Sequence, residues 1–119
     1  SVMTEKEVPM LEAASQEYAD LAQKTLDLLT EFDLESWKDY LADDVVWYWP
    51  DGSSKTRHSI EGKEELIKWW ENWKETTGGQ LSFANNTILP LKVNKPSNYY
   101  KEVGTGVLLY TDLTISLQD

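Results

Sequence analysis

The six tryptophans are the residues of this chain best suited to bind a small molecule. Trp47 and Trp49 lie two positions apart in a β-type segment, so their indoles are expected on one face of a strand. Trp70 and Trp73 share a helical face with Leu66. Converging indoles would form a flat, apolar pocket for rings or sugar faces, where each N–H can donate a hydrogen bond. The alternative is that these rings simply fill the core of a small domain.

Few side chains are suited to transfer a proton. His58 is the one histidine, and histidine is the side chain that exchanges protons near neutral pH. Asp112 and Tyr110 share one face of the predicted last strand, from which either side chain can reach a cavity. Asp43 and Asp44 lie at a helix-to-strand junction, where carboxylates commonly cap or turn the chain. The candidate catalytic residues are therefore His58 and Asp112, although a purely structural histidine is the simpler interpretation of His58.

The composition excludes several classes of function. The chain has no cysteine, which rules out disulfides, thiolate metal sites and a cysteine nucleophile, and a single histidine makes a zinc site unexpected. Acidic residues outnumber basic ones 21 to 11, and the net charge of −10 repels nucleic acids and anionic membranes. No apolar run approaches the roughly 20 residues that span a bilayer. We predict no metal, no cofactor, no nucleic-acid partner and no membrane insertion.

The cellular compartment stays open at this level. The first residues lack the apolar segment of a secretory signal, and the chain begins at Ser1 rather than at a methionine. Both a cytoplasmic protein and an exported protein with its leader removed fit this sequence.

Three helices are predicted before residue 79. The first begins between Pro9 and Ser15, and Asp33 caps the second, which ends near residues 42–44. The third opens at residues 61–65 and ends at the glycine pair 78–79. The apolar stripe predicted for the first helix consists of Tyr18, Leu21, Ala22, Thr25, Leu28, Leu29 and Phe32.

The remaining segments have β-type patterns. Residues 44–49 and 55–60 predict a hairpin around Pro50-Asp51-Gly52. Residues 81–93 predict one long strand or two, with Pro90 at an edge or bulge, and residues 99–117 predict another long strand after a turn at 95–98. We interpret residues 1–9 as a flexible tail and residues 10–119 as a single α+β domain.

Two passages resemble the NTF2-like (SnoaL-like) superfamily. Residues 32–47, from Phe32-Asp33-Leu34 through Ala42-Asp43-Asp44 to Trp47, look like the family's passage from a short helix into the first strand. Gly62-Lys63-Glu64-Glu65-Leu66-Ile67 looks like the start of its third helix. The resemblance covers roughly residues 15–117. It implies a cone-shaped fold in which three N-terminal helices pack in a strongly curved, mostly antiparallel sheet. That sheet usually continues for another strand, so a C-terminal strand is expected to be missing.

The resemblance does not decide the function, because the superfamily includes ketosteroid isomerases, cyclases, dehydratases, hydrolases and non-catalytic modules. Matched to the ketosteroid isomerases, the general-base aspartate falls on Trp49, the oxyanion-hole tyrosine on Thr25 and its supporting tyrosine on Trp70. An indole cannot abstract a proton, and Thr25 is a poor substitute for a phenol donor. The resemblance therefore argues against steroid-type isomerisation while placing Thr25 and Trp70 toward the cavity.

Three hypotheses follow, and whether the chain is an enzyme stays open. The first is binding of a small apolar or cyclic molecule in an aromatic-lined cavity. The second is a cofactor-independent isomerase, cyclase, dehydratase or hydrolase that uses His58 and a strand carboxylate. The third is a purely structural dimerisation domain. The expected ligand contacts are Trp47, Trp49, Trp70, Trp73, Leu66, Thr25 and Tyr110.

The family resemblance also implies a homodimer. Apolar residues lie on both sides of the predicted last strand, and a strand that is apolar on both sides needs cover on both faces. In this family a second subunit often supplies that cover by packing through the sheet. The residues expected to be covered in this way are drawn from Val103, Val107, Leu109, Leu113 and Ile115.

Overall fold

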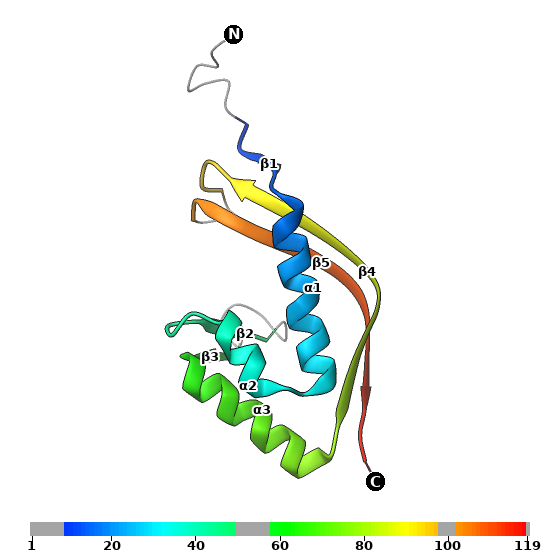
Figure 1. Ribbon diagram of the computed structural model, residues 1–119. Coiled ribbons are helices and arrows are strands. Elements are labelled where there is room, and N and C mark those ends of the chain that lie inside the picture. The colour runs from blue at the N-terminus through cyan, green and yellow to red at the C-terminus, as the bar shows by residue number, and fades with distance from the viewer. Residues whose placement is uncertain (1–8, 50–57, 98–101, 119) are drawn as a thin grey trace. The chain divides into compact units, whose positions relative to one another are not determined.

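The computed structural model describes residues 9–49, 58–97 and 102–118 (Figure 1). Its three α-helices and antiparallel strands confirm the predicted α+β class. The chain forms two compact units, residues 1–26 with 83–112 and residues 27–82 with 113–119, which are described in turn. The elements are β1 (Leu11–Ala13), α1 (Gln16–Glu31), α2 (Leu34–Trp37), the 3-10 helix η2 (Lys38–Tyr40), β2 (Val46–Tyr48), β3 (Ser59–Glu61), α3 (Lys63–Thr77), β4 (Gln80–Val93) and β5 (Gly104–Ser116).

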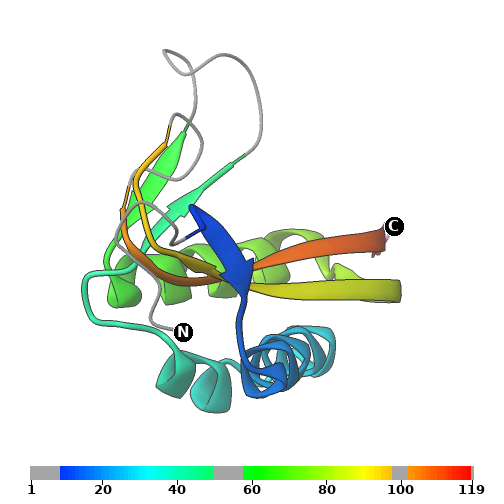
Figure 2. The same ribbon diagram turned by 90° about the horizontal axis from the view of Figure 1, so that it is seen from above.

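The first unit is organised by a sheet with the strand order β1-β4-β5. β1 pairs antiparallel with the end of β4, with Leu11 opposite Val93 and Ala13 opposite Leu91. β4 and β5 lie side by side and run in opposite directions (Figures 1 and 2). β1 was not predicted, because three residues are too few to show an alternating pattern. Only their pairing with β4 makes them a strand.

The long strands follow the predicted segments. β4 is one continuous strand over residues 80–93, and the Pro90 carbonyl accepts a 3.0 Å hydrogen bond from the Ala14 amide. β5 begins at Gly104, later than the predicted residue 99, and ends at Ser116. Residues 98–101, which include part of the predicted turn, lie outside the described residues.

Helix α1 begins one residue after the predicted range, at Gln16, where the Ser15 hydroxyl accepts a hydrogen bond from the Glu17 amide at 3.3 Å. The predicted apolar stripe is only partly correct, because Tyr18 and Leu21 are 42% and 49% exposed. Leu28 and Leu29 of that stripe are buried as predicted, and the buried face also includes Ala19 and Leu26, which were not predicted. Tertiary packing therefore shifted the buried face around the helix, away from Tyr18 and Leu21.

Phe32 ends α1 in a backbone conformation that favours glycine. Its φ angle is 58°, in the left-handed region. The Asp33 amide donates to the Leu28 carbonyl at 2.9 Å, and the Phe32 amide donates to the Leu29 carbonyl at 3.1 Å. This is the arrangement of a Schellman cap, whose left-handed position is usually occupied by glycine. The Phe32 ring stacks on Trp73 at a centroid distance of 6.1 Å, so ring packing offsets the backbone strain.

This strain makes a prediction about two substitutions at one position. Both Phe32→Ala and Phe32→Gly remove the ring, but only glycine also relieves the left-handed strain. We expect Phe32→Gly to be more stable than Phe32→Ala by about 1 kcal/mol. Urea denaturation of the two variants, followed by circular dichroism, measures this difference. An alanine variant as stable as the glycine variant would show that the backbone at this position is not strained.

The second unit begins with a shorter helix than predicted. Asp33 caps α2 as expected, accepting a hydrogen bond from the Ser36 amide at 3.2 Å. The helix ends at Trp37, continues as the 3-10 helix η2 to Tyr40, and does not reach residues 42–44. Asp43 instead accepts a backbone hydrogen bond from Lys63 at 3.0 Å, and its carboxylate lies 3.4 Å from the Lys63 ammonium. These contacts with Lys63 give Asp43 a structural role rather than a catalytic one.

The hairpin and α3 complete the second unit. β2 pairs antiparallel with β3, with Val46 opposite Glu61 and Tyr48 opposite Ser59, so both strands are shorter than predicted. The predicted turn 50–52 and the start of the returning strand lie outside the described residues. α3 ends as predicted, because Gly78 adopts a φ of 61° and a side chain there would collide with Gln118.

Candidate functional site

All six tryptophans and one phenylalanine form a continuous group of rings within the second unit, here called the aromatic cluster. Trp70 lies at its centre, with ring centroids 5.0 Å from Trp69, 5.5 Å from Trp73 and 6.0 Å from Trp47. Most neighbouring rings meet edge to face, the arrangement that aromatic quadrupoles favour. The structure thus brings together the four tryptophans that were predicted to share a site. The cluster consists of Phe32, Trp37, Trp47, Trp49, Trp69, Trp70 and Trp73.

Local periodicity explains how two elements supply most of these rings. Trp47 and Trp49 point to one side of the β2 segment, while the intervening Tyr48 is 61% exposed on the other side. On α3, the spacing of Leu66, Trp70 and Trp73 places them on one helical face, and Leu66 is fully buried. The strand and the helix therefore present their rings to each other.

A pocket of about 490 Å³ opens beside the cluster. Two half-buried indoles, Trp49 and Trp69, form its aromatic wall, with ring centroids 4.8 Å apart and planes inclined at 47°. Its volume lies in the range of small-molecule sites, roughly 300–1,000 Å³. The lining residues are Trp49, His58, Ser59, Ile60 and Trp69.

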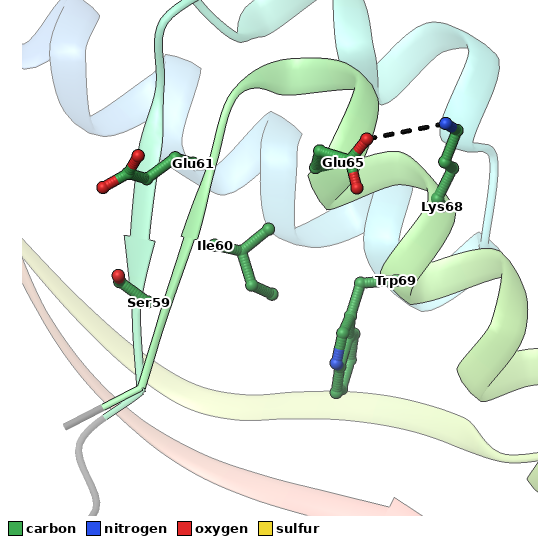
Figure 3. Close-up of a pocket in the computed structure, with 6 residues that line it drawn as sticks. All are labelled: Ser59, Ile60, Glu61, Glu65, Lys68 and Trp69. Carbon is green, nitrogen blue, oxygen red and sulfur yellow. Dashed lines mark hydrogen bonds and ion pairs between the residues drawn. The ribbon is translucent and has the colours of Figure 1, made fainter. Parts of the chain in front are cut away.

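A second pocket of about 440 Å³ adjoins the first and shares Ser59, Ile60 and Trp69 with it. Figure 3 shows the Ile60 side chain on the side of β3 nearer α3, with Trp69 extending from the helix. Glu65 and Lys68 lie along the helix and form an ion pair at 3.5 Å. The paired charges belong to this second pocket, so the first pocket keeps a largely apolar wall.

His58 is exposed and lies at the rim of the first pocket. Its backbone carbonyl accepts a 3.0 Å hydrogen bond from the Trp49 amide, which extends the β2–β3 pairing and brings His58 next to Trp49. Asp51, which belongs to the predicted turn of this hairpin, lies outside the described residues. Elsewhere in the unit, a hydrogen bond and the charge of Glu35 raise the pKa of Lys38, whose ammonium lies 3.0 Å from that carboxylate.

The other predicted site residues belong to the first unit. The Thr25 hydroxyl donates to the Ala22 carbonyl of its own helix at 2.7 Å. Tyr110 is 61% exposed on β5, and Asp112 accepts a hydrogen bond from the Asn85 amide group at 2.8 Å. Asn85 has a φ of 55°, a left-handed value that asparagine tolerates better than most residues. Thr25 and Asp112 are therefore hydrogen-bonded to other residues of the first unit, and Tyr110 is exposed.

Three pocket residues were absent from the predicted site: Ser59, Ile60 and Trp69. Helical spacing places Trp69 beside the face of Leu66, Trp70 and Trp73, but spacing alone does not show which face opens to solvent. The sequence does indicate Ile60 as a neighbour of His58 in the site, because strand alternation places both residues on the same side.

The family model described as "SnoaL-like domain" matches residues 22–90, more than half of the chain. The chain belongs to the SnoaL-like family. This confirms the resemblance proposed from residues 32–47 and 62–67, both of which lie inside the match.

Two further comparisons accompany the family match. Among curated proteins, none matches this SnoaL-like domain. Among solved structures, it is similar to the crystal structure of a proposed isomerase from Bacillus subtilis at 15% sequence identity, with a TM-score of 0.45. The similarity covers 86% of this chain and 76% of that one. A likeness at this level transfers no activity, so function must be argued from the site itself.

Two general properties of the described residues complete the description of the SnoaL-like domain. Within residues 9–49, 58–97 and 102–118, no helix is long and apolar enough to cross a membrane. Over the same ranges, no three histidine or carboxylate side chains gather as a metal-binding group.

Proposed function

We propose that this SnoaL-like domain binds a small apolar or cyclic molecule in the pocket beside the aromatic cluster. The observation that carries the proposal is the wall formed by Trp49 and Trp69, which remain half-buried while Trp70 behind them is only 5% exposed. Indole rings that are packed on one side and accessible on the other offer flat apolar area at little entropic cost. Rings and sugar faces are the shapes that match such a wall.

The pocket's polar groups favour a neutral ligand. His58 and Ser59 line the rim of this pocket, and its described lining includes no carboxylate and no lysine. A charged ligand would lose hydration against the indoles without gaining a partner of opposite charge. Trp47, Trp70, Trp73 and Leu66 then support this apolar wall from behind.

Catalysis in the same pocket is the second candidate, and the position of His58 is the observation that favours it. An isomerase, cyclase, dehydratase or hydrolase needs a general acid or base within hydrogen-bond reach of the ligand, and His58 at the rim is suited to that role. A single exposed imidazole is also compatible with binding alone. We therefore place binding first.

Intrinsic tryptophan fluorescence tests the binding proposal. The protein is titrated with small aromatic, steroid-like and sugar compounds, and binding is expected to change the emission of Trp49 and Trp69. Backbone amide shifts in NMR locate the site, since Ser59 and Ile60 should move while Leu11–Ala13 of β1 should not. No response to any compound class, hydrophobic dyes included, would contradict the proposal.

We also propose that the domain forms a homodimer through its sheet. β5 exposes a row of apolar side chains, among them Val107 at 40% and Leu109 at 37%. Residues 104–116 contain a single charged residue, Asp112, although the whole chain carries a net charge of −10. A strand with so little charge is where two acidic copies can approach each other with little repulsion, and it leaves apolar area that a second copy would cover.

The double substitution Val107→Lys with Leu109→Lys tests this dimer. We expect the parent protein to sediment as a dimer at micromolar concentration and the variant to sediment as a monomer. Added lysines reduce the net negative charge, so general electrostatic repulsion cannot explain a dissociation. Tyr48→Lys, on β2, is the control and should leave the dimer intact. A parent protein that is monomeric at high micromolar concentration would rule the proposal out.

A further inference from the structure

Two indole N–H groups at the centre of the aromatic cluster lack a hydrogen-bond acceptor. The Nε1 atoms of Trp47 and Trp70 are buried, and the described residues offer neither of them a partner. Both belong to rings that contact each other, with centroids 6.0 Å apart and planes at 90°. Buried polar groups are nearly always paired in native proteins, so two unpaired donors in adjacent rings require an explanation.

The energetic argument points to an acceptor from outside the protein. Each buried, unpaired N–H destabilises the fold by roughly 1–3 kcal/mol. A phenylalanine at either position would carry no N–H and would avoid that penalty, although it would retain only part of the ring area. A ligand oxygen that accepts from these donors would turn the penalty into binding free energy.

The two donors lie directly behind the pocket wall. Trp49 is 5.5 Å from Trp47 and 6.1 Å from Trp70, while Trp69 is 5.0 Å from Trp70, measured between ring centroids. A ligand seated against Trp49 and Trp69 is therefore one ring layer away from both N–H groups. Donation from either N–H to such a ligand therefore requires Trp49 or Trp69, which are only half-buried, to turn aside when the ligand binds.

We infer that Trp47 and Trp70 donate hydrogen bonds to a neutral oxygen acceptor of the bound molecule, such as a ring ketone, ester carbonyl or ether. This inference rests on the proposed binding function and specifies its ligand class. An indole N–H donates but cannot accept, which selects for an acceptor oxygen. An anion is disfavoured, because the chain is strongly acidic and Lys74, which lies against the Phe32 ring of the cluster, is engaged with the Gly79 carbonyl.

A matched pair of ligands separates this inference from simple apolar binding. 2-Tetralone and tetralin have nearly the same shape, but only 2-tetralone carries a carbonyl oxygen. In ¹⁵N-labelled protein, the Trp47 and Trp70 indole protons are expected to shift downfield with 2-tetralone and to stay in place with tetralin. The indole signals are assigned with single Trp→Phe variants. 2-Tetralone should also bind about 25-fold more tightly than tetralin, because each of the two hydrogen bonds contributes about fivefold.

Substitution of one donor provides an independent readout. Trp47→Phe should reduce the ratio of the 2-tetralone to tetralin affinities about fivefold. Trp37→Phe removes another indole that contacts Trp47, at 6.2 Å, and should leave the ratio unchanged. Equal binding of both compounds with unmoved indole signals would overturn the inference and leave the binding proposal intact. Indole protons that are already hydrogen-bonded in the free protein and unaffected by 2-tetralone would also overturn the inference. Failure of both compounds to bind would count against the binding proposal itself.

Discussion

Replacing Trp70 with alanine is expected to lower the unfolding free energy by about 3–5 kcal/mol, the range for removing a large aromatic side chain from a core. Trp70 is 5% exposed and is the ring that connects the aromatic cluster, since it contacts Phe32, Trp47, Trp49, Trp69 and Trp73. Its removal leaves a cavity that four tryptophans and a phenylalanine border. A loss of this size is a large fraction of the 5–15 kcal/mol by which domains are typically stable.

Two companion variants make this prediction specific. Trp70→Phe retains part of the ring area and should fall between the parent protein and Trp70→Ala. Trp69→Ala removes the neighbouring indole, which is half-buried and contacts two rings, so its loss should be less than half that of Trp70→Ala. Urea denaturation followed by circular dichroism measures all three. A Trp70→Ala loss no greater than that of Trp69→Ala would mean that Trp70 is not the centre of the core.

For ligand affinity we expect the opposite order, with Trp69 contributing more than Trp70. Trp69→Ala removes half of the aromatic pocket wall and should weaken binding at least tenfold, which corresponds to about 1.4 kcal/mol. Interface residues with large effects on affinity are commonly tryptophans whose removal exposes the rest of a site to water. Because the Trp69 variant is expected to stay folded, its loss of affinity can be measured directly by calorimetry with whichever compound class binds the parent protein.

Tyr48→Ala is the matched control for this measurement. Tyr48 lies on β2 between Trp47 and Trp49, but its side chain is 61% exposed on the other side of the strand. Its removal should leave the affinity within twofold of the parent value. A Trp69 variant that binds as tightly as the Tyr48 variant would exclude the pocket beside β3 and α3 as the binding site.

Several features of the fold and site were predictable because they depend on neighbours in the sequence. The end of α3 was predictable because Gly78 can adopt a left-handed backbone at little cost, and the start of α2 because Asp33 can cap it. Trp47 and Trp49 were expected on one side of a strand because side chains alternate. These features follow from the backbone geometry of a few consecutive residues.

Other features were not predictable because they depend on contacts between distant segments. Leu11–Ala13 became a strand only through pairing with β4, and tertiary packing extended the buried face of α1 to Ala19 and Leu26 while leaving Tyr18 and Leu21 exposed. Phe32 occupies a position that favours glycine because ring packing with Trp73 compensates for it, and nothing in the local sequence indicates that compensation. In each of these cases a non-local contact outweighed a local preference.

By itself, the sequence determined the α+β class, the SnoaL-like family and the group of tryptophans from which a site would be built. Composition, periodicity and the two family passages carry that information, because each is a property of residues close together in the chain. Only the tertiary structure decided that Trp49 and Trp69 line a pocket while Trp70 is enclosed and the N–H groups of Trp47 and Trp70 lack partners. Burial and hydrogen-bond pairing depend on which elements meet in space, and side-chain type alone does not specify them.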